Sequence, residues 1–216
     1  MLSRPELDLL KSKGVSFSDP TEVVTLFETR VAEICGSKYA VAVDCNTHAV
    51  ELCLRYLQPK SKITIPSHTY PSIPMTLEHL GLEWEFSNIE WQGSYHIDPL
   101  PIIDASLQFR YGIHQPQSFT CLSFQFKKRI PIGRGGMILC DDDAAYEWLT
   151  KASYDGRSRG VKWHEDLISM LGFHYYMTPE DAARGLLLLD ELGSEHEDMG
   201  GWQNYPDLRT FPVFSK

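Results

Sequence analysis

The sequence has no long apolar run and no excess of basic residues. No apolar stretch in its 216 residues approaches the length of a membrane span, so we expect no membrane partner. The formal net charge of -9 argues against nucleic acid as the main partner. The remaining composition is ordinary for a soluble globular chain that is large enough to bury a substantial core.

Paired cysteine motifs are also missing. The five cysteines are scattered, odd in number and mostly set in apolar segments, and none forms a Cys-x-x-Cys pair. This arrangement suggests neither a zinc site nor a disulfide framework. Residues 1–5 open no signal-peptide pattern, so we expect a cytoplasmic protein.

Short apolar strands alternate with amphipathic helices along the chain. We expect residues 1–18 to form an irregular arm, followed by a helix that is capped by Asp19, has Pro20 at its first position and closes at Gly36. The strands are continuously apolar rather than alternating, which predicts an α/β fold with a mostly parallel central sheet covered by helices on both faces. The predicted strands span 39–43, 62–66, 82–87, 119–124 and 137–140, and the helices span 47–57, 71–80, 143–149 and 179–192.

A loop with several basic residues and glycines connects two of these strands. Residues 123–136 read Ser-Phe-Gln-Phe-Lys-Lys-Arg-Ile-Pro-Ile-Gly-Arg-Gly-Gly. A lysine held by rigid backbone on both sides can be positioned to attack a carbonyl group. The alternative is that Lys127, Lys128 and Arg129 form a solvated basic turn.

The pattern Ser-Phe-x-x-x-Lys-x-x-x-x-Gly-x-Gly-Gly resembles the lysine loop of the DegT-like sugar aminotransferases. These are pyridoxal-phosphate enzymes of fold type I that act on nucleotide-linked keto sugars. The resemblance implies pyridoxal 5'-phosphate as the cofactor, Lys128 as the catalytic residue that forms the internal aldimine, and Ser123 as a contact of the cofactor phosphate.

Two strand ends resemble cofactor contacts of the same family. Asn46 and Thr47 begin a helix where the family has Gly-Thr, and a helix N-terminus is suited to binding phosphate. Tyr70 lies where the family places an aromatic ring that stacks on the pyridine ring. Without the resemblance, Asn46 or Thr47 would be a helix cap and Tyr70 an ordinary half-buried tyrosine.

Asp104 directly follows a buried apolar run and therefore needs a partner. The resemblance makes it the carboxylate that keeps the pyridine nitrogen protonated, whereas the alternative is a cap for the following turn. The family has Gln or His three residues later, but this chain has Leu107 followed by Gln108. We include Gln108 among the expected cofactor contacts, with its role left open.

The segment 171–180 resembles a family segment in which an asparagine reaches the cofactor phosphate of the neighbouring subunit. His174 stands in place of that asparagine and Tyr176 in place of an arginine. A histidine can still donate a hydrogen bond to phosphate, and the alternative is a surface or interface histidine. The resemblance implies a homodimer with cofactor sites at its interface.

The expected organisation is an arm over residues 1–18, a cofactor-binding large domain over 19–192 and a short tail over 193–216. The tail is too short for the small domain that closes over the substrate in the family. The implied function is transfer of an amino group from a donor such as glutamate to a nucleotide-linked keto sugar. The alternatives are a truncated, catalytically degenerate member that acts as a binding or assembly protein, and a cofactor-dependent reaction of the dehydratase type.

Overall fold

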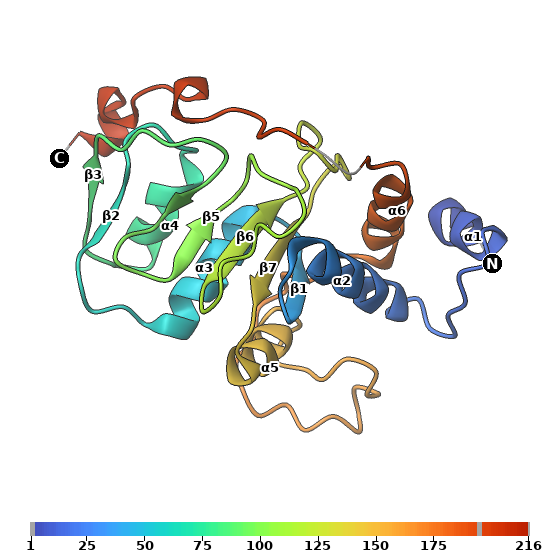
Figure 1. Cartoon of the computed structure of the whole chain (residues 1–216). Coiled ribbons are helices and arrows are strands. Elements are labelled where there is room, and N and C mark those ends of the chain that lie inside the picture. The colour runs from blue at the N-terminus through green and yellow to red at the C-terminus, as the bar shows by residue number, and fades with distance from the viewer. Residues whose placement is uncertain (1–2, 194–195, 216) are drawn as a thin grey trace.

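A five-stranded sheet forms the centre of the computed structural model, which describes residues 3–193 and 196–215 (Figure 1). Its strand order is β1-β7-β6-β5-β4. Next to it lies a two-stranded parallel sheet, β2-β3. The strands are β1 (Tyr39–Val43), β2 (Ile63–Pro66), β3 (Trp84–Ser87), β4 (Tyr95–His96), β5 (Ile102–Asp104), β6 (Phe119–Ser123) and β7 (Gly136–Cys140).

The α/β class is confirmed, but the central sheet is mixed. Strands β1, β5 and β6 run in the same direction, whereas β7 is antiparallel to both β1 and β6, and β4 is antiparallel to β5. The physical reason is the connection between β6 and β7. It contains no crossover helix, so the chain returns beside the strand it has just left, and this return produces an antiparallel pair.

Helices cover both faces of the sheet, as predicted. Val41 and Val43 of β1 pack in one apolar core, whereas Ala40 and Ala42 of the same strand pack in the other. Helices α3 and α5 contribute to the first core, and α1, α2 and α6 to the second (Figure 1). The helices are α1 (Pro5–Ser12), α2 (Glu22–Cys35), α3 (Asn46–Leu57), α4 (Ser72–His79), α5 (Asp143–Ala152) and α6 (Pro179–Asp190).

The N-terminal segment differs from the predicted irregular arm. Helix α1 begins with Pro5, and its Leu7 and Leu10 are buried against α6. The spacing of these two leucines, one helical turn apart, gives α1 an apolar stripe that a loop would leave exposed. The following helix begins at Glu22 rather than at Pro20, because the Asp19 carboxylate accepts a hydrogen bond from the Thr21 amide at 2.7 Å in a preceding turn.

The segment from 196 to 215 runs across the top of the molecule in Figure 1 and ends beside β3. It contains three short 3-10 helices, Trp202–Asn204, Leu208–Thr210 and Pro212–Phe214. Backbone hydrogen bonds join it to the rest of the chain. The Met199 amide donates to the Leu107 carbonyl at 2.8 Å, and the Leu208 amide donates to the Ser67 carbonyl at 2.9 Å. In the described ranges, no helix combines the length and the apolar character needed to cross a membrane.

Gly136 allows the start of α3 to approach the sheet. A Cβ atom at this position would lie 2.4 Å from the carbonyl carbon of Cys45 and 2.6 Å from the amide nitrogen of Asn46. Both are backbone atoms, which cannot rotate away. The glycine at the beginning of β7 therefore sets the distance between the glycine-rich loop and the N-terminus of α3.

We expect Gly136→Ala to lower the free energy of unfolding by about 1–3 kcal/mol, because the new methyl group overlaps backbone. Urea denaturation measures this difference. The matched control is Gly193→Ala, where the nearest atom to the new Cβ is a histidine carbon 3.7 Å away. Equal unfolding free energies for the two variants would contradict the close approach.

Candidate active site

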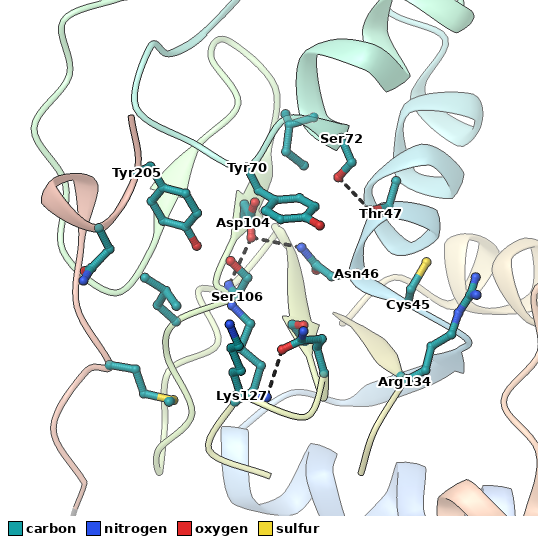
Figure 2. Close-up of a pocket in the computed structure, with 18 residues that line it drawn as sticks. Cys45, Asn46, Thr47, Tyr70, Ser72, Asp104, Ser106, Lys127, Arg134 and Tyr205 are labelled. Carbon is teal, nitrogen blue, oxygen red and sulfur yellow. Dashed lines mark hydrogen bonds between the residues drawn. The ribbon is translucent and has the colours of Figure 1, made fainter. Parts of the chain in front are cut away.

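A cavity of about 560 Å³ opens where three strands that run in the same direction come to an end (Figure 2). Strand β1 leads into the start of α3, β5 ends at Asp104 and β6 ends at Ser123. Six of the eight residues that the sequence predicted as cofactor contacts line this cavity: Asn46, Thr47, Tyr70, Asp104, Ser123 and Lys128.

Asp104 is the one acidic side chain among the described residues that line the cavity, and 2% of its surface is exposed. Its Oδ1 accepts hydrogen bonds from the Ser106 amide at 3.0 Å and from Asn46 Nδ2 at 3.1 Å, and its Oδ2 accepts one from the Tyr95 hydroxyl at 2.8 Å. The Tyr95 oxygen is itself 2.6 Å from the Thr69 hydroxyl. These bonds hold the carboxylate in one orientation while leaving lone pairs that can accept from a ligand.

The N-terminus of α3 forms a second part of the cavity wall. Thr47 Oγ1 lies 2.7 Å from Ser72 Oγ at the start of α4, and Figure 2 shows this pair beside Asn46. Helix α3 has no side-chain cap. The buried Oδ1 of Asn46 has no hydrogen-bond partner among the described residues. The first turn therefore offers backbone N–H groups and a positive dipole end to an anion.

Lys128 reaches the cavity from the loop between β6 and β7. Its amide donates to the Gln125 carbonyl at 2.8 Å, which closes a tight turn around the lysine. Burial lowers the pKa of the Lys128 amine, and the negative charge of Asp104 opposes this effect only in part. A larger fraction of the amine is therefore uncharged near neutral pH than in an exposed lysine.

Tyr70 lies at the mouth of the cavity, between the end of β2 and the start of α4. Its side chain points in beside Asp104 and Asn46, although 60% of the residue is exposed (Figure 2). The predicted half-buried alternative is therefore wrong for this residue. A flat aromatic face at the mouth of a cavity can stack on a planar ligand.

Two of the predicted residues lie elsewhere. Gln108 donates from Nε2 to Asp198 Oδ1 at 3.0 Å, while its neighbour Leu107 lines the cavity. The His174 side chain is 72% exposed and pairs with Asp155 at 3.0 Å. In this single chain neither side chain contributes to the cavity, because each is directed at its own carboxylate partner.

Several cavity residues were missed by the sequence reasoning. Arg134 occupies the variable position of the Gly-x-Gly-Gly motif, so the signal was present in the loop itself. Ser106 follows Asp104 by two residues, and its amide supports that carboxylate. No local pattern indicated the residues that arrive from the C-terminal segment: Met199, Asn204 and Tyr205.

A cluster of charged side chains flanks the start of α3. Asp44 accepts from Arg134 Nη2 at 2.9 Å and lies 2.5 Å from His48 Nδ1, and the His48 ring stacks on Tyr175. Burial alone would lower the pKa of His48, but the contacts with Asp44 and Cys45 outweigh it and raise the pKa to about 9. Ligand atoms of Asp44, Cys45 and His48 lie within 4.8 Å of one another, a spacing compatible with a metal ion.

A family model matches most of the chain that forms this cavity. The model of the DegT/DnrJ/EryC1/StrS aminotransferase family matches residues 9–107 and 110–198. The chain belongs to this family. The expected resemblance is therefore confirmed at the level of the family. The match is interrupted at residues 108 and 109. This interruption includes Gln108, a predicted cofactor contact whose side chain bonds Asp198 instead of lining the cavity.

Individual relatives agree with the family match. The spore coat polysaccharide biosynthesis protein SpsC of Bacillus subtilis (strain 168) is 23% identical over an alignment of 249 positions, gaps included, which covers 87% of this chain and 63% of SpsC.

Solved structures show the same fold. The sugar aminotransferase CalS13 from Micromonospora echinospora superimposes with a TM-score of 0.67 at 14% identity, covering 86% of this chain and 64% of that chain. The putative sugar aminotransferase Spr1654 from Streptococcus pneumoniae, in its PLP-form, gives a TM-score of 0.64 at 16% identity and covers 88% and 65%. This chain thus spans less than two thirds of each of these relatives.

The Asp44–His48 pair predicts a dependence of stability on pH. The folded-state pKa of His48 is raised from 6.5 to about 9, so the pair contributes its full stabilisation below pH 6.5 and loses it as the pH rises through 9. NMR titration of the His48 ring measures this pKa directly. We expect Asp44→Asn to return it toward 6.5, and an unchanged midpoint in that variant would contradict the assignment of the shift to Asp44.

Proposed function

We propose that this chain is a pyridoxal-phosphate-dependent aminotransferase in which Lys128 carries the cofactor. The observation that supports the proposal most directly is the meeting of a partly buried lysine and a buried aspartate, Lys128 and Asp104, in one cavity at the start of α3. A phosphate-bearing aldehyde with a basic ring nitrogen uses the lysine, the aspartate and the N-terminus of α3 at once.

The residues present fit this cofactor. Asp104 would hold the ring nitrogen in its protonated form, because its carboxylate is buried and fixed by three donors. Thr47, Ser123 and the free amides of α3 would hold the phosphate, and the unpartnered Asn46 oxygen would accept a hydrogen bond there or from a bound water. Tyr70 would cover one face of the ring.

The cofactor supplies an electron sink that makes a proton on the amino donor's α-carbon acidic. Lys128 then has two tasks. Its amine binds the cofactor when no amino donor is present, and afterwards its Nζ accepts the proton from the donor and returns a proton at the acceptor carbon. The lowered pKa of Lys128 suits both tasks, because an uncharged nitrogen has the lone pair that each requires.

We propose a nucleotide-linked keto sugar as the amino acceptor and an amino acid such as glutamate as the donor. The family supports this choice, and the cavity agrees with anionic reactants. Lys127 and Arg134 line its mouth, and both side chains are largely solvent-exposed. Arg134 is already paired with Asp44, so the positive charge that attracts carboxylates and phosphates to this rim comes mainly from Lys127.

We propose that two chains form a homodimer. Apolar side chains are unusually exposed in the segment 161–171, which connects α5 to α6. Leu171 is 94% exposed and Leu167 is 86% exposed, and Trp163 and Ile168 are exposed nearby. A second copy of the chain would remove these side chains from water.

Replacing Lys128 with alanine should abolish covalent attachment of pyridoxal phosphate and reduce turnover to background, because no other amine would occupy the same position. Incubation with the cofactor, borohydride reduction and peptide mass spectrometry locate the attachment site. The neighbouring variant Lys127→Ala is the matched control and should keep the modification on Lys128. An active Lys128→Ala variant would contradict the proposal.

The attachment experiment, together with an assay of amino transfer, separates the proposed function from the alternatives. A folded wild-type chain without any modified lysine would support the catalytically degenerate binding or assembly protein. A modified Lys128 without glutamate-dependent amination of any keto sugar would favour a reaction of the dehydratase type. Formation of 2-oxoglutarate from glutamate, coupled to an aminated sugar, distinguishes an aminotransferase from both.

The exposed 161–171 segment gives a prediction about assembly. We expect Leu171→Glu to shift the chain from dimer to monomer, because a charge would have to be desolvated at the interface. Light scattering after size-exclusion chromatography measures the molar mass. Val213→Glu, at a position that is 69% exposed in the C-terminal segment, serves as the control and should leave the dimer intact. A monomeric wild-type chain would contradict this part of the proposal.

A further inference from the structure

Three residues of the cavity wall lie beyond the part of the chain that matches the family. The match ends at residue 198, whereas Met199, Asn204 and Tyr205 all line the cavity. The shared features of the family therefore do not account for this side of the site. Tyr205 is of most interest, because its phenol can act as a hydrogen-bond donor.

The backbone around Tyr205 is fixed to the rest of the fold. Its amide donates to the Trp202 carbonyl at 3.1 Å, and its carbonyl accepts from His68 Nδ1 at 2.8 Å. The ring packs at a tilt against Trp91 with 5.7 Å between ring centroids. Held from three directions, the phenol is pre-organised toward the cavity rather than free to turn into solvent.

Tyr205 and the anion-binding end of α3 lie on opposite sides of Asp104. Figure 2 shows Tyr205 on one side of the aspartate and Thr47, Cys45 and Arg134 on the other. In pyridoxal phosphate, the phosphate arm and the ring oxygen are attached to the two carbons that flank the aldehyde-bearing carbon, so they point to opposite sides of the ring. With the nitrogen at Asp104 and the phosphate at α3, the ring oxygen faces the Tyr205 side.

We propose that Tyr205 is a cofactor-binding residue whose hydroxyl donates a hydrogen bond to the ring oxygen of pyridoxal phosphate. This inference rests on the proposed function, since it concerns the same cofactor in the same cavity. It assigns the C-terminal segment a direct part in cofactor binding.

The surroundings of Tyr205 keep its proton in place. Burial and the nearby negative charge of Asp104 raise the pKa of the Tyr205 phenol to about 12. A side-chain hydrogen bond with Ser106 lowers this pKa, but by less than the other two effects raise it. The phenol is therefore a donor throughout the neutral range. Two side-chain amides lie nearby. Gln108 already donates to Asp198 at 3.0 Å, and the Asn204 side chain is oriented by the Gly201 amide, which donates to its Oδ1 at 2.8 Å.

The test compares two cofactors on two full-length chains. The dissociation constants of pyridoxal phosphate and of its 3-deoxy analogue, which has no ring oxygen, are measured by absorbance titration for the wild type and for Tyr205→Phe. A hydrogen bond to a charged oxygen is worth about 1.5 kcal/mol, so the wild type should prefer pyridoxal phosphate about tenfold. Tyr205→Phe should bind pyridoxal phosphate about tenfold more weakly and lose that preference. Tyr111→Phe, at an exposed tyrosine outside the cavity wall, is the matched control.

The outcomes separate this inference from the proposed function. If Tyr205→Phe retains the wild-type preference for the ring oxygen, the inference is wrong, while binding at Lys128 still supports the proposed function. If the variant loses affinity equally for both cofactors, the phenol acts only in packing and the inference is again wrong. A wild-type chain that binds neither cofactor would overturn both. Loss of the preference in Tyr205→Phe alone, with Tyr111→Phe unchanged, supports the hydrogen bond.

Discussion

The buried carboxylate of Asp104 joins the parts of the chain on which the cavity depends. It accepts hydrogen bonds from Asn46 at the start of α3, from Tyr95 of β4 and from the backbone after β5. A polar group at 2% exposure is tolerated only when such donors offset its loss of hydration. The same donors fix its orientation, so the arrangement that folding requires is also the one that the proposed binding of a protonated ring nitrogen would use.

The end of the loop between β6 and β7 packs closely against the start of α3. Gly136 lets the backbone of Cys45 and Asn46 approach β7 at distances that no side chain would permit. This approach brings the positive end of α3 to the ends of β5 and β6, where Asp104 and Ser123 face the cavity. A partly buried amine, a fixed carboxylate and the uncapped N-terminus of α3 thus share one cavity, although each comes from a different element.

Local patterns in the sequence were sufficient for most of the fold and for much of the site. The limits of β1 and the closure of α2 at Gly36 were correct because apolar runs and a left-handed glycine act over a few residues. The mixed sheet was missed because strand direction depends on connections, and α1 was missed because its stripe is only two leucines. Tyr205 was unpredictable for a similar reason, since its position depends on contacts with His68 and Trp91, more than a hundred residues earlier in the chain.

The most direct test of this account is a crystal structure of the chain with pyridoxal phosphate, in which the distance from the ring nitrogen to the Asp104 carboxylate is measured. The account predicts a hydrogen bond of about 2.7–2.9 Å, the usual length for a charged nitrogen donor and a carboxylate, with the phosphate at the first turn of α3. A cofactor whose ring nitrogen faces away from Asp104, or whose phosphate lies away from α3, would contradict it.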